Sequence, residues 1–97
     1  MKQIVFLKEA EEETLDAAKY YESKADNLGI EFLAEVENPA QRISDNPEAA
    51  PIVRSNIRRS LLPRFPFGIL YGMNKKEIVV IAVMHLRCSP EYWHDRY

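Results

Sequence analysis

The residue types best suited to chemistry at neutral pH are few and lie near the end of the chain. His85 is an imidazole, the side chain whose protonation most readily changes near pH 7, so it could act as a proton-transfer group. The alternative is a strand-end histidine bonded to a neighbouring carbonyl or carboxylate. Cys88 is the single cysteine, which excludes an internal disulfide. With His85 it falls far short of a metal-ligand set, so we expect a semi-buried or strand-end thiol and no metal.

The charge of the chain divides unevenly after Pro51. Residues 1–51 hold five basic and twelve acidic side chains, a net charge of −7, whereas residues 52–97 hold eight basic and three acidic ones, a net charge of +5. A basic second half would attract an acidic partner, either nucleic acid or an acidic protein segment. Simple solvation of both halves is the alternative.

Length and composition predict one compact domain over residues 1–97. Hydrophobic residues make up 46% and charged residues 29% of the chain, which is typical of a folded protein rather than a disordered one. The longest apolar run, residues 78–84, is far shorter than the roughly 18 residues of a membrane span. Acidic residues follow the first apolar residues before a cleavage site could form, which argues against a signal peptide. We therefore expect a cytoplasmic protein.

The first half predicts a short strand and two helices. Residues 4–7 form a brief apolar run suited to a strand. Residues 8–26 contain helix formers without glycine or proline, and residues 27–29 (Asn-Leu-Gly) can end a helix and turn the chain. A second helix is expected from Ile30 to the Asn-Pro pair at residues 46–47. Its apolar stripe has a spacing of four, four and three: Phe32, Val36, Ala40 and Ile43.

Pro39 lies inside the second predicted helix. A proline removes one intrahelical hydrogen bond and clashes with the preceding turn, so a kink or break is expected near residues 37–38.

The second half predicts strands. Residues 46–51 (NPEAAP) indicate a loop, and strands are expected at residues 56–62, 67–72 and 78–84. In the second of these strands the large side chains on one face alternate with a small or apolar set on the other: Phe67, Ile69 and Tyr71 against Gly68, Leu70 and Gly72. The unbroken run at 78–84 suits a central strand covered on both faces. The expected fold is α+β, with a helical hairpin covering one face of the sheet. No Gly-rich phosphate loop or other cofactor-binding motif is present in the sequence.

Several segments together resemble the ParE/RelE toxin superfamily, whose members are often labelled plasmid stabilisation proteins. They are AKYYESKADNLGIEFLAEV, NPEAAP, RRSLLPRFPFGILY and IAVMHLRCSPEYW, of which FPFGILY and HLRCSPEYW are the most specific. The resemblance implies a two-layer fold with an N-terminal strand, a helical hairpin and a three-stranded antiparallel meander. It further implies a bacterial or archaeal growth-arresting toxin of a type II toxin–antitoxin system, which a co-expressed antitoxin neutralises.

One activity that the resemblance implies is the ribosome-dependent mRNA cleavage of RelE-like members. Attack within the mRNA needs a base, positive charge at the phosphate and a proton donor. On this hypothesis the catalytic residues are His85, Arg87 and Tyr92, with His85 and Arg87 on one strand face. RelE-like sequences commonly bear an arginine at the position of Gly68, and its absence here weakens the nuclease hypothesis.

The other implied activity is the binding of DNA gyrase by ParE-like members, which requires no catalytic set. Arginine, tyrosine and tryptophan are enriched at binding hot spots. The candidate target-binding residues are Arg58, Arg59, Arg64, Arg87, Tyr92, Trp93 and Arg96. The alternative is a solvated strand or loop position for each arginine, and for Trp93 a tail residue packed on the sheet.

The leading hypothesis is therefore a ParE-like toxin that engages DNA gyrase and has a cognate antitoxin as its partner. The resemblance implies that an acidic antitoxin segment crosses the sheet or the helical hairpin, where the basic second half would attract it. A RelE-like endonuclease acting on the ribosome and mRNA is the alternative. A degenerate member that has lost toxicity is a third reading, and both a homodimer and a toxin–antitoxin hetero-oligomer remain open.

Overall fold

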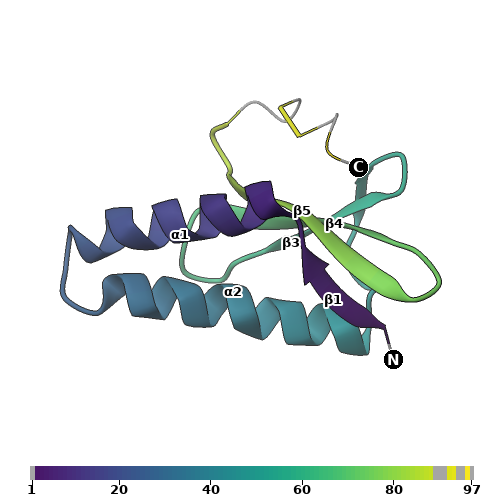
Figure 1. The fold of residues 1–97 in the computed structure, drawn as a ribbon, viewed down its shortest axis with the longest axis horizontal. Coiled ribbons are helices and arrows are strands. Elements are labelled where there is room, and N and C mark those ends of the chain that lie inside the picture. The colour runs from purple at the N-terminus through teal and green to yellow at the C-terminus, as the bar shows by residue number, and fades with distance from the viewer. Residues whose placement is uncertain (1, 89–91, 94–95, 97) are drawn as a thin grey trace.

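The computed structural model describes residues 2–88, 92, 93 and 96, and for residues 39–41 the backbone only. Its elements follow one another along the chain as β1 (Gln3–Phe6), α1 (Lys8–Glu22), α2 (Leu28–Asp45), β2 (Ile52–Arg54), β3 (Ile57–Leu61), β4 (Phe67–Met73) and β5 (Glu77–His85). Both helices lie on the same side of one sheet (Figure 1). The predicted α+β fold with a helical hairpin over the sheet is confirmed.

The sheet has the strand order β1-β5-β4-β3-β2. β1 pairs with β5 in parallel, and the predicted meander of β3, β4 and β5 is antiparallel. No sequence pattern predicted β2, which adds a fourth antiparallel strand before the meander. All three residues of β2 are exposed, so this edge strand has no buried alternating face by which a sequence pattern could reveal it.

The connection between the helices is longer than predicted. α1 ends at Glu22 rather than near residue 26, and α2 begins at Leu28 rather than at Ile30. The Glu22 carboxylate accepts hydrogen bonds from the backbone N–H groups of Asn27 (2.9 Å) and Gly29 (3.0 Å). It thus caps the start of α2, where backbone N–H groups have no partner within the helix and where negative charge is favoured. Asn27 has the positive φ of 69° that its place in the turn predicts.

α2 continues as a single helix through position 39, so of the kink or break predicted near residues 37–38 the break does not occur. A proline in a helix interior costs about 3 kcal/mol. The buried side chains of Phe32, Val36 and Ile43 pack both ends of α2 against the sheet, which offsets that cost. They confirm the predicted stripe, except that the side chain of Ala40 lies outside the described residues.

Each face of the sheet carries its own core. The first lies beneath the helices and includes Phe67, Ile69 and Tyr71 of β4, as the alternation predicted. The second lies on the opposite face and includes Leu70, Ile81 and Met84. β5 is therefore buried on both faces, also as predicted, although β4 rather than β5 is the middle strand of the sheet. Trp93, from the tail after β5, joins the second core and is only 4% exposed.

Gly29 allows the two helices to approach each other, and its replacement gives a clear test. A Cβ at this position would lie 2.4 Å from the carbonyl oxygen of Ala18, a backbone atom of α1. Helix propensity alone predicts that Gly29→Ala stabilises the protein by about 1 kcal/mol. We expect the opposite, a loss of about 1–3 kcal/mol in the free energy of unfolding, because the helices must move apart. Urea unfolding measures the sign.

Gly68→Ala is the matched control for this substitution. A Cβ at Gly68 would meet the Cγ of Arg59 at 3.0 Å, but this neighbour is a side chain that can shift. The loss should therefore be clearly smaller than for Gly29→Ala. Equal effects at the two glycines would contradict the proposed helix contact.

Candidate functional site

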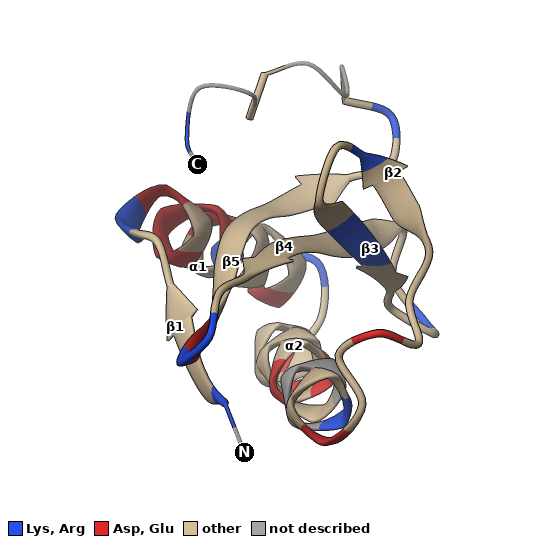
Figure 2. Ribbon diagram, turned by 90° about the vertical axis from the view of Figure 1, so that its right-hand side faces the viewer, with Lys and Arg blue, Asp and Glu red and all other residues tan. Residues whose placement is uncertain are grey.

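The charge division seen in the sequence becomes a spatial one in the fold. α1 packs against β5 and carries a row of acidic residues, whereas arginines lie on β3, two strands away from β5 in the sheet (Figure 2). Positive and negative surfaces are thus presented by different elements, and a partner could meet them separately.

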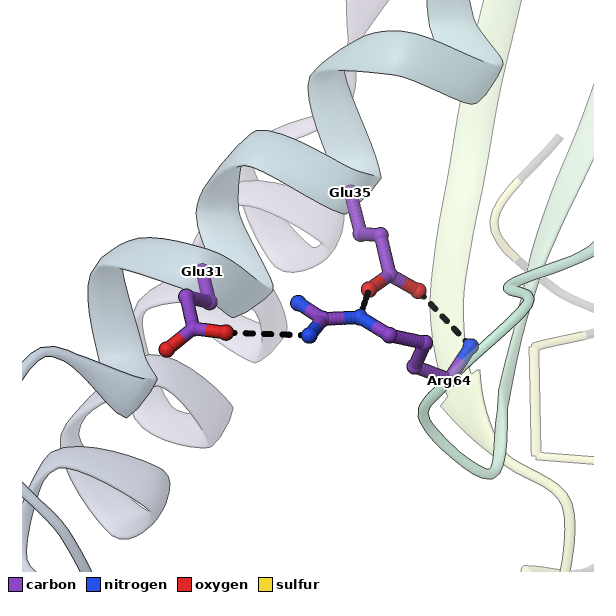
Figure 3. Close-up of polar contacts among 3 residues, drawn as sticks. All are labelled: Glu31, Glu35 and Arg64. Carbon is purple, nitrogen blue, oxygen red and sulfur yellow. Dashed lines mark hydrogen bonds and ion pairs between the residues drawn. The ribbon is translucent and has the colours of Figure 1, made fainter.

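Of the predicted target-binding arginines, Arg58, Arg64 and Arg96 are engaged within the protein, and the first two hold loops. Arg58 donates through Nη1 to the backbone carbonyls of Glu48 (2.9 Å) and Ala50 (2.6 Å), and so attaches the loop before β2 to β3. Arg64 donates to Glu35 and, at 3.0 Å, to Glu31, and its backbone N–H donates to Glu35 (Figure 3). The hydrogen bonds to Glu35 and then to Glu31 raise the pKa of Arg64. Both arginines join a loop to the remainder of the fold.

Arg59 lies on the sheet face opposite the helices, and Gly68 makes room for it. The aliphatic part of Arg59 crosses β4 so closely that a Cβ at Gly68 would meet its Cγ and Cδ at 3.0 and 3.1 Å. Leu61, on the same face, is 51% exposed. From the sequence, Gly68 was interpreted as the loss of a phosphate-binding side chain. In the structure it also leaves the space in which Arg59 of the neighbouring strand β3 lies.

The tail returns to the edge of β5 through Arg96. Its Nη1 donates to the Glu13 carboxylate of α1 (3.0 Å) and to the carbonyl of Ile81 (3.1 Å), and Glu13 also accepts from the N–H of Val83 (3.1 Å). β1 pairs with β5 only as far as the register of Phe6 with Val80. Beyond that point, Glu13 and Arg96 bind backbone groups that a longer strand would otherwise have bound. We call this arrangement the edge clamp.

The structure places only part of the predicted nuclease set together. His85 and Tyr92 line one cavity, and Arg87 is not among the described residues that line it. β5 ends at His85, so Arg87 lies beyond the strand and the predicted shared strand face does not form. The Nδ1 of His85 accepts a hydrogen bond from the backbone N–H of Arg87 (3.0 Å), so the partner of this strand-end histidine is an N–H group rather than the carbonyl or carboxylate of the alternative.

Tyr92 is 40% exposed and holds its proton tightly. Burial of its hydroxyl is the largest cause that raises its pKa, and a hydrogen bond to Glu13 raises it further, so that it lies well above the ordinary range of tyrosine. A phenol with such a pKa stays neutral at physiological pH. It can donate a hydrogen bond there, and it is poorly suited to act as a base.

The remaining predicted residues divide between core and surface. Trp93 packs on the sheet, as its alternative interpretation stated, and its burial leaves the indole inaccessible to a partner in this conformation. Arg87 is exposed. Cys88 follows the end of β5 closely, as expected, but it is exposed rather than semi-buried.

No motif pointed to the residues of α1 that line the cavity with His85 and Tyr92, among them Glu13, Asp16 and Tyr20. Spacings of three and four place them on one helix face, which was the available signal. Their nearness to β5 and the tail could not be inferred from that spacing.

Among the described residues, no helix is long and apolar enough to cross a membrane. No family model and no curated protein matches the sequence. A solved structure described as "Chromosomal ParDE TA system from P. aeruginosa" contains a chain that superposes with a TM-score of 0.64 at 15% sequence identity. The match covers 88% of this chain and 96% of that one. At this identity the likeness establishes the fold, and the protein therefore has the ParE-like fold that its sequence motifs predicted.

Proposed function

We propose that this protein is the toxin of a type II toxin–antitoxin system, that it arrests growth by binding DNA gyrase in the cytoplasm, and that a cognate antitoxin neutralises it. The observation that carries the proposal is the fold likeness to a chain from a toxin–antitoxin system over 88% of this protein. Because one fold can host several activities, the choice of gyrase rests on the ParE-like sequence resemblance, and the preference for binding over RNA cleavage rests on the surface residues.

The surface residues favour binding over RNA cleavage. The cavity that holds His85 and Tyr92 also holds the carboxylates of Glu13 and Asp16, which would repel an RNA phosphate. Arg96, a basic group beside this set, already pairs with Glu13. Arg59 and Arg87 instead lie outside any described ion pair, with Leu61 exposed beside Arg59, a combination of types suited to a protein interface.

The test is to express the protein without an antitoxin and to assay the purified toxin for two activities in parallel. We expect growth arrest and inhibition of gyrase supercoiling, without ribosome-dependent mRNA cleavage. Cleavage without gyrase inhibition would favour the RelE-like alternative. Normal growth with neither activity would favour the degenerate reading, in which the antitoxin-binding surface alone is retained.

Two surface variants refine this assay. Arg59→Ala should weaken gyrase inhibition by roughly 5-fold to 30-fold, the effect of removing a hot-spot side chain worth about 1–2 kcal/mol. Arg64→Ala removes the same charge from an arginine that already pairs with Glu31 and Glu35 of α2, so it is the control for the loss of charge alone. An equal effect of both variants would indicate non-specific attraction by positive charge rather than a defined interface.

A further inference from the structure

The cavity beside the edge clamp combines features that the proposed function does not use. It has a volume of about 860 Å³ and opens between α1, the end of β5 and the tail. Its apolar lining comes from Ala17, Phe67 and Val83, and tyrosines from both α1 and the tail border it. Tyr20 is 58% exposed, although it is a large aromatic residue. An exposed aromatic wall over an apolar floor is typical of a binding site.

The rings at this cavity already hold cations that belong to the protein itself. The Nζ of Lys24 lies 5.1 Å from the ring centroid of Tyr20, and the Cζ of Arg96 lies 4.9 Å from the ring centroid of Tyr92. These are the distances of cation–π interactions, in which the negative ring face attracts a positive charge. A positive group from a partner would therefore replace Lys24 at the ring of Tyr20 or bind the other face of that ring.

The carboxylates of the cavity differ in their availability. Glu13 is occupied by Arg96 and by the N–H of Val83. Asp16, one helical turn further along α1, is exposed and forms no ion pair with any described residue. A carboxylate beside aromatic rings and an apolar floor provides a counter-ion and a surface for an alkyl stem at the same time.

We propose that this cavity binds an arginine or lysine side chain of a partner protein, with Asp16 as its counter-ion and Tyr20 as its aromatic wall. A cavity of this size exceeds the needs of a lone ammonium ion, and its apolar floor suits the alkyl stem of a long basic side chain. The inference goes beyond the proposed function, because it requires neither toxicity nor gyrase binding. A partner would thus place a basic side chain against α1, in addition to any acidic side chains that it places against the arginines of the sheet.

The test uses the full-length protein and N-acetyl-arginine amide, followed by chemical-shift titration of the Tyr20 ring and the Val83 methyl groups. N-acetyl-citrulline amide is the control ligand, since it has nearly the same shape without the charge. We expect saturable shifts with the arginine compound and at least about 5-fold weaker binding of the citrulline compound, the factor that about 1 kcal/mol of cation–π and ionic attraction supplies. Tyr20→Ala should weaken binding of the arginine compound by a similar factor.

A pair of charge variants separates a local contact from general attraction. Asp16→Asn should weaken binding of the arginine compound by about 3-fold to 5-fold, the effect of an exposed ionic contact. Glu12→Gln removes the same charge from an exposed position of α1 outside the described cavity lining, and should leave binding unchanged. Equal binding of the two ligands, equal effects of the two variants, or shifts that map elsewhere would each overturn the proposal. Tighter binding of spermidine than of the arginine compound would overturn the assignment to a protein side chain.

Discussion

Phe32→Ala is expected to lower the free energy of unfolding by about 3–5 kcal/mol, the range for removing a fully buried phenylalanine. Phe32 is 0% exposed and lies at the centre of an aromatic cluster. Its ring centroid is 5.4 Å from that of Tyr21, 5.2 Å from that of Phe65 and 5.0 Å from that of Phe67. These partners come from α1, from the loop before β4 and from β4 itself, so a cavity at position 32 would loosen the attachment of both helices to the sheet.

Leu33→Ala is the matched control, because it removes a large apolar side chain from the next residue of the same helix. Leu33 is among the exposed residues, so we expect a loss within about 0.5–1 kcal/mol. Urea unfolding of both variants gives the comparison. Losses of equal size would mean that the aromatic cluster does not provide the main attachment of α2.

Glu13→Ala is expected to lower the free energy of unfolding by about 2–3 kcal/mol. The substitution removes the acceptor of the Val83 N–H and the ion-pair partner of Arg96, and these groups are partly buried. Glu13→Gln retains an acceptor oxygen and should lose about half as much. Since the edge clamp protects the Val83 amide, hydrogen exchange at that amide should accelerate in Glu13→Ala.

The variant Glu12→Ala controls for the loss of an acidic residue from α1, and its exposed position predicts a change within about 0.5 kcal/mol. A double-mutant cycle of Glu13→Ala with Arg96→Ala isolates the pair itself. We expect a coupling of about 1 kcal/mol, because solvent reaches both side chains in part. Additive losses would mean that the two side chains stabilise the edge of β5 independently.

Local patterns predicted the elements that have one buried face. The spacing of Phe32, Val36 and Ile43 predicted α2, and the alternation around Phe67 and Ile69 predicted β4. The same logic failed at β2, which buries nothing, and at position 39, where tertiary packing outweighed the local preference of proline. The observed end of α1 and start of α2 differ from the predicted ones by four and two residues. The Glu22 carboxylate caps α2 through a side-chain contact, which helix propensity does not take into account.

The candidate site was harder to predict from the sequence than the fold. The tail residues Tyr92 and Arg96 could be named from their types, but the partner that both of them meet is Glu13, 83 residues before Arg96. The spacing of three residues places Glu13 on the same helix face as Asp16, but it does not predict that Glu13 meets the tail. Only the end of β1 at Phe6, which leaves the edge of β5 open, gives Glu13 its role.

By itself, the sequence determined which segments with a buried face become helix or strand, which faces they bury and how charge divides between the halves, because these properties depend on residues close together in the chain. The tertiary structure alone decided which of the chemically capable side chains meet. It buried Trp93, engaged Arg58 and Arg64, extended Arg59 over Gly68 and placed Asp16 and Tyr20 at one cavity with Tyr92. These encounters depend on the pairing of distant strands and on helix packing, to which no local periodicity is sensitive.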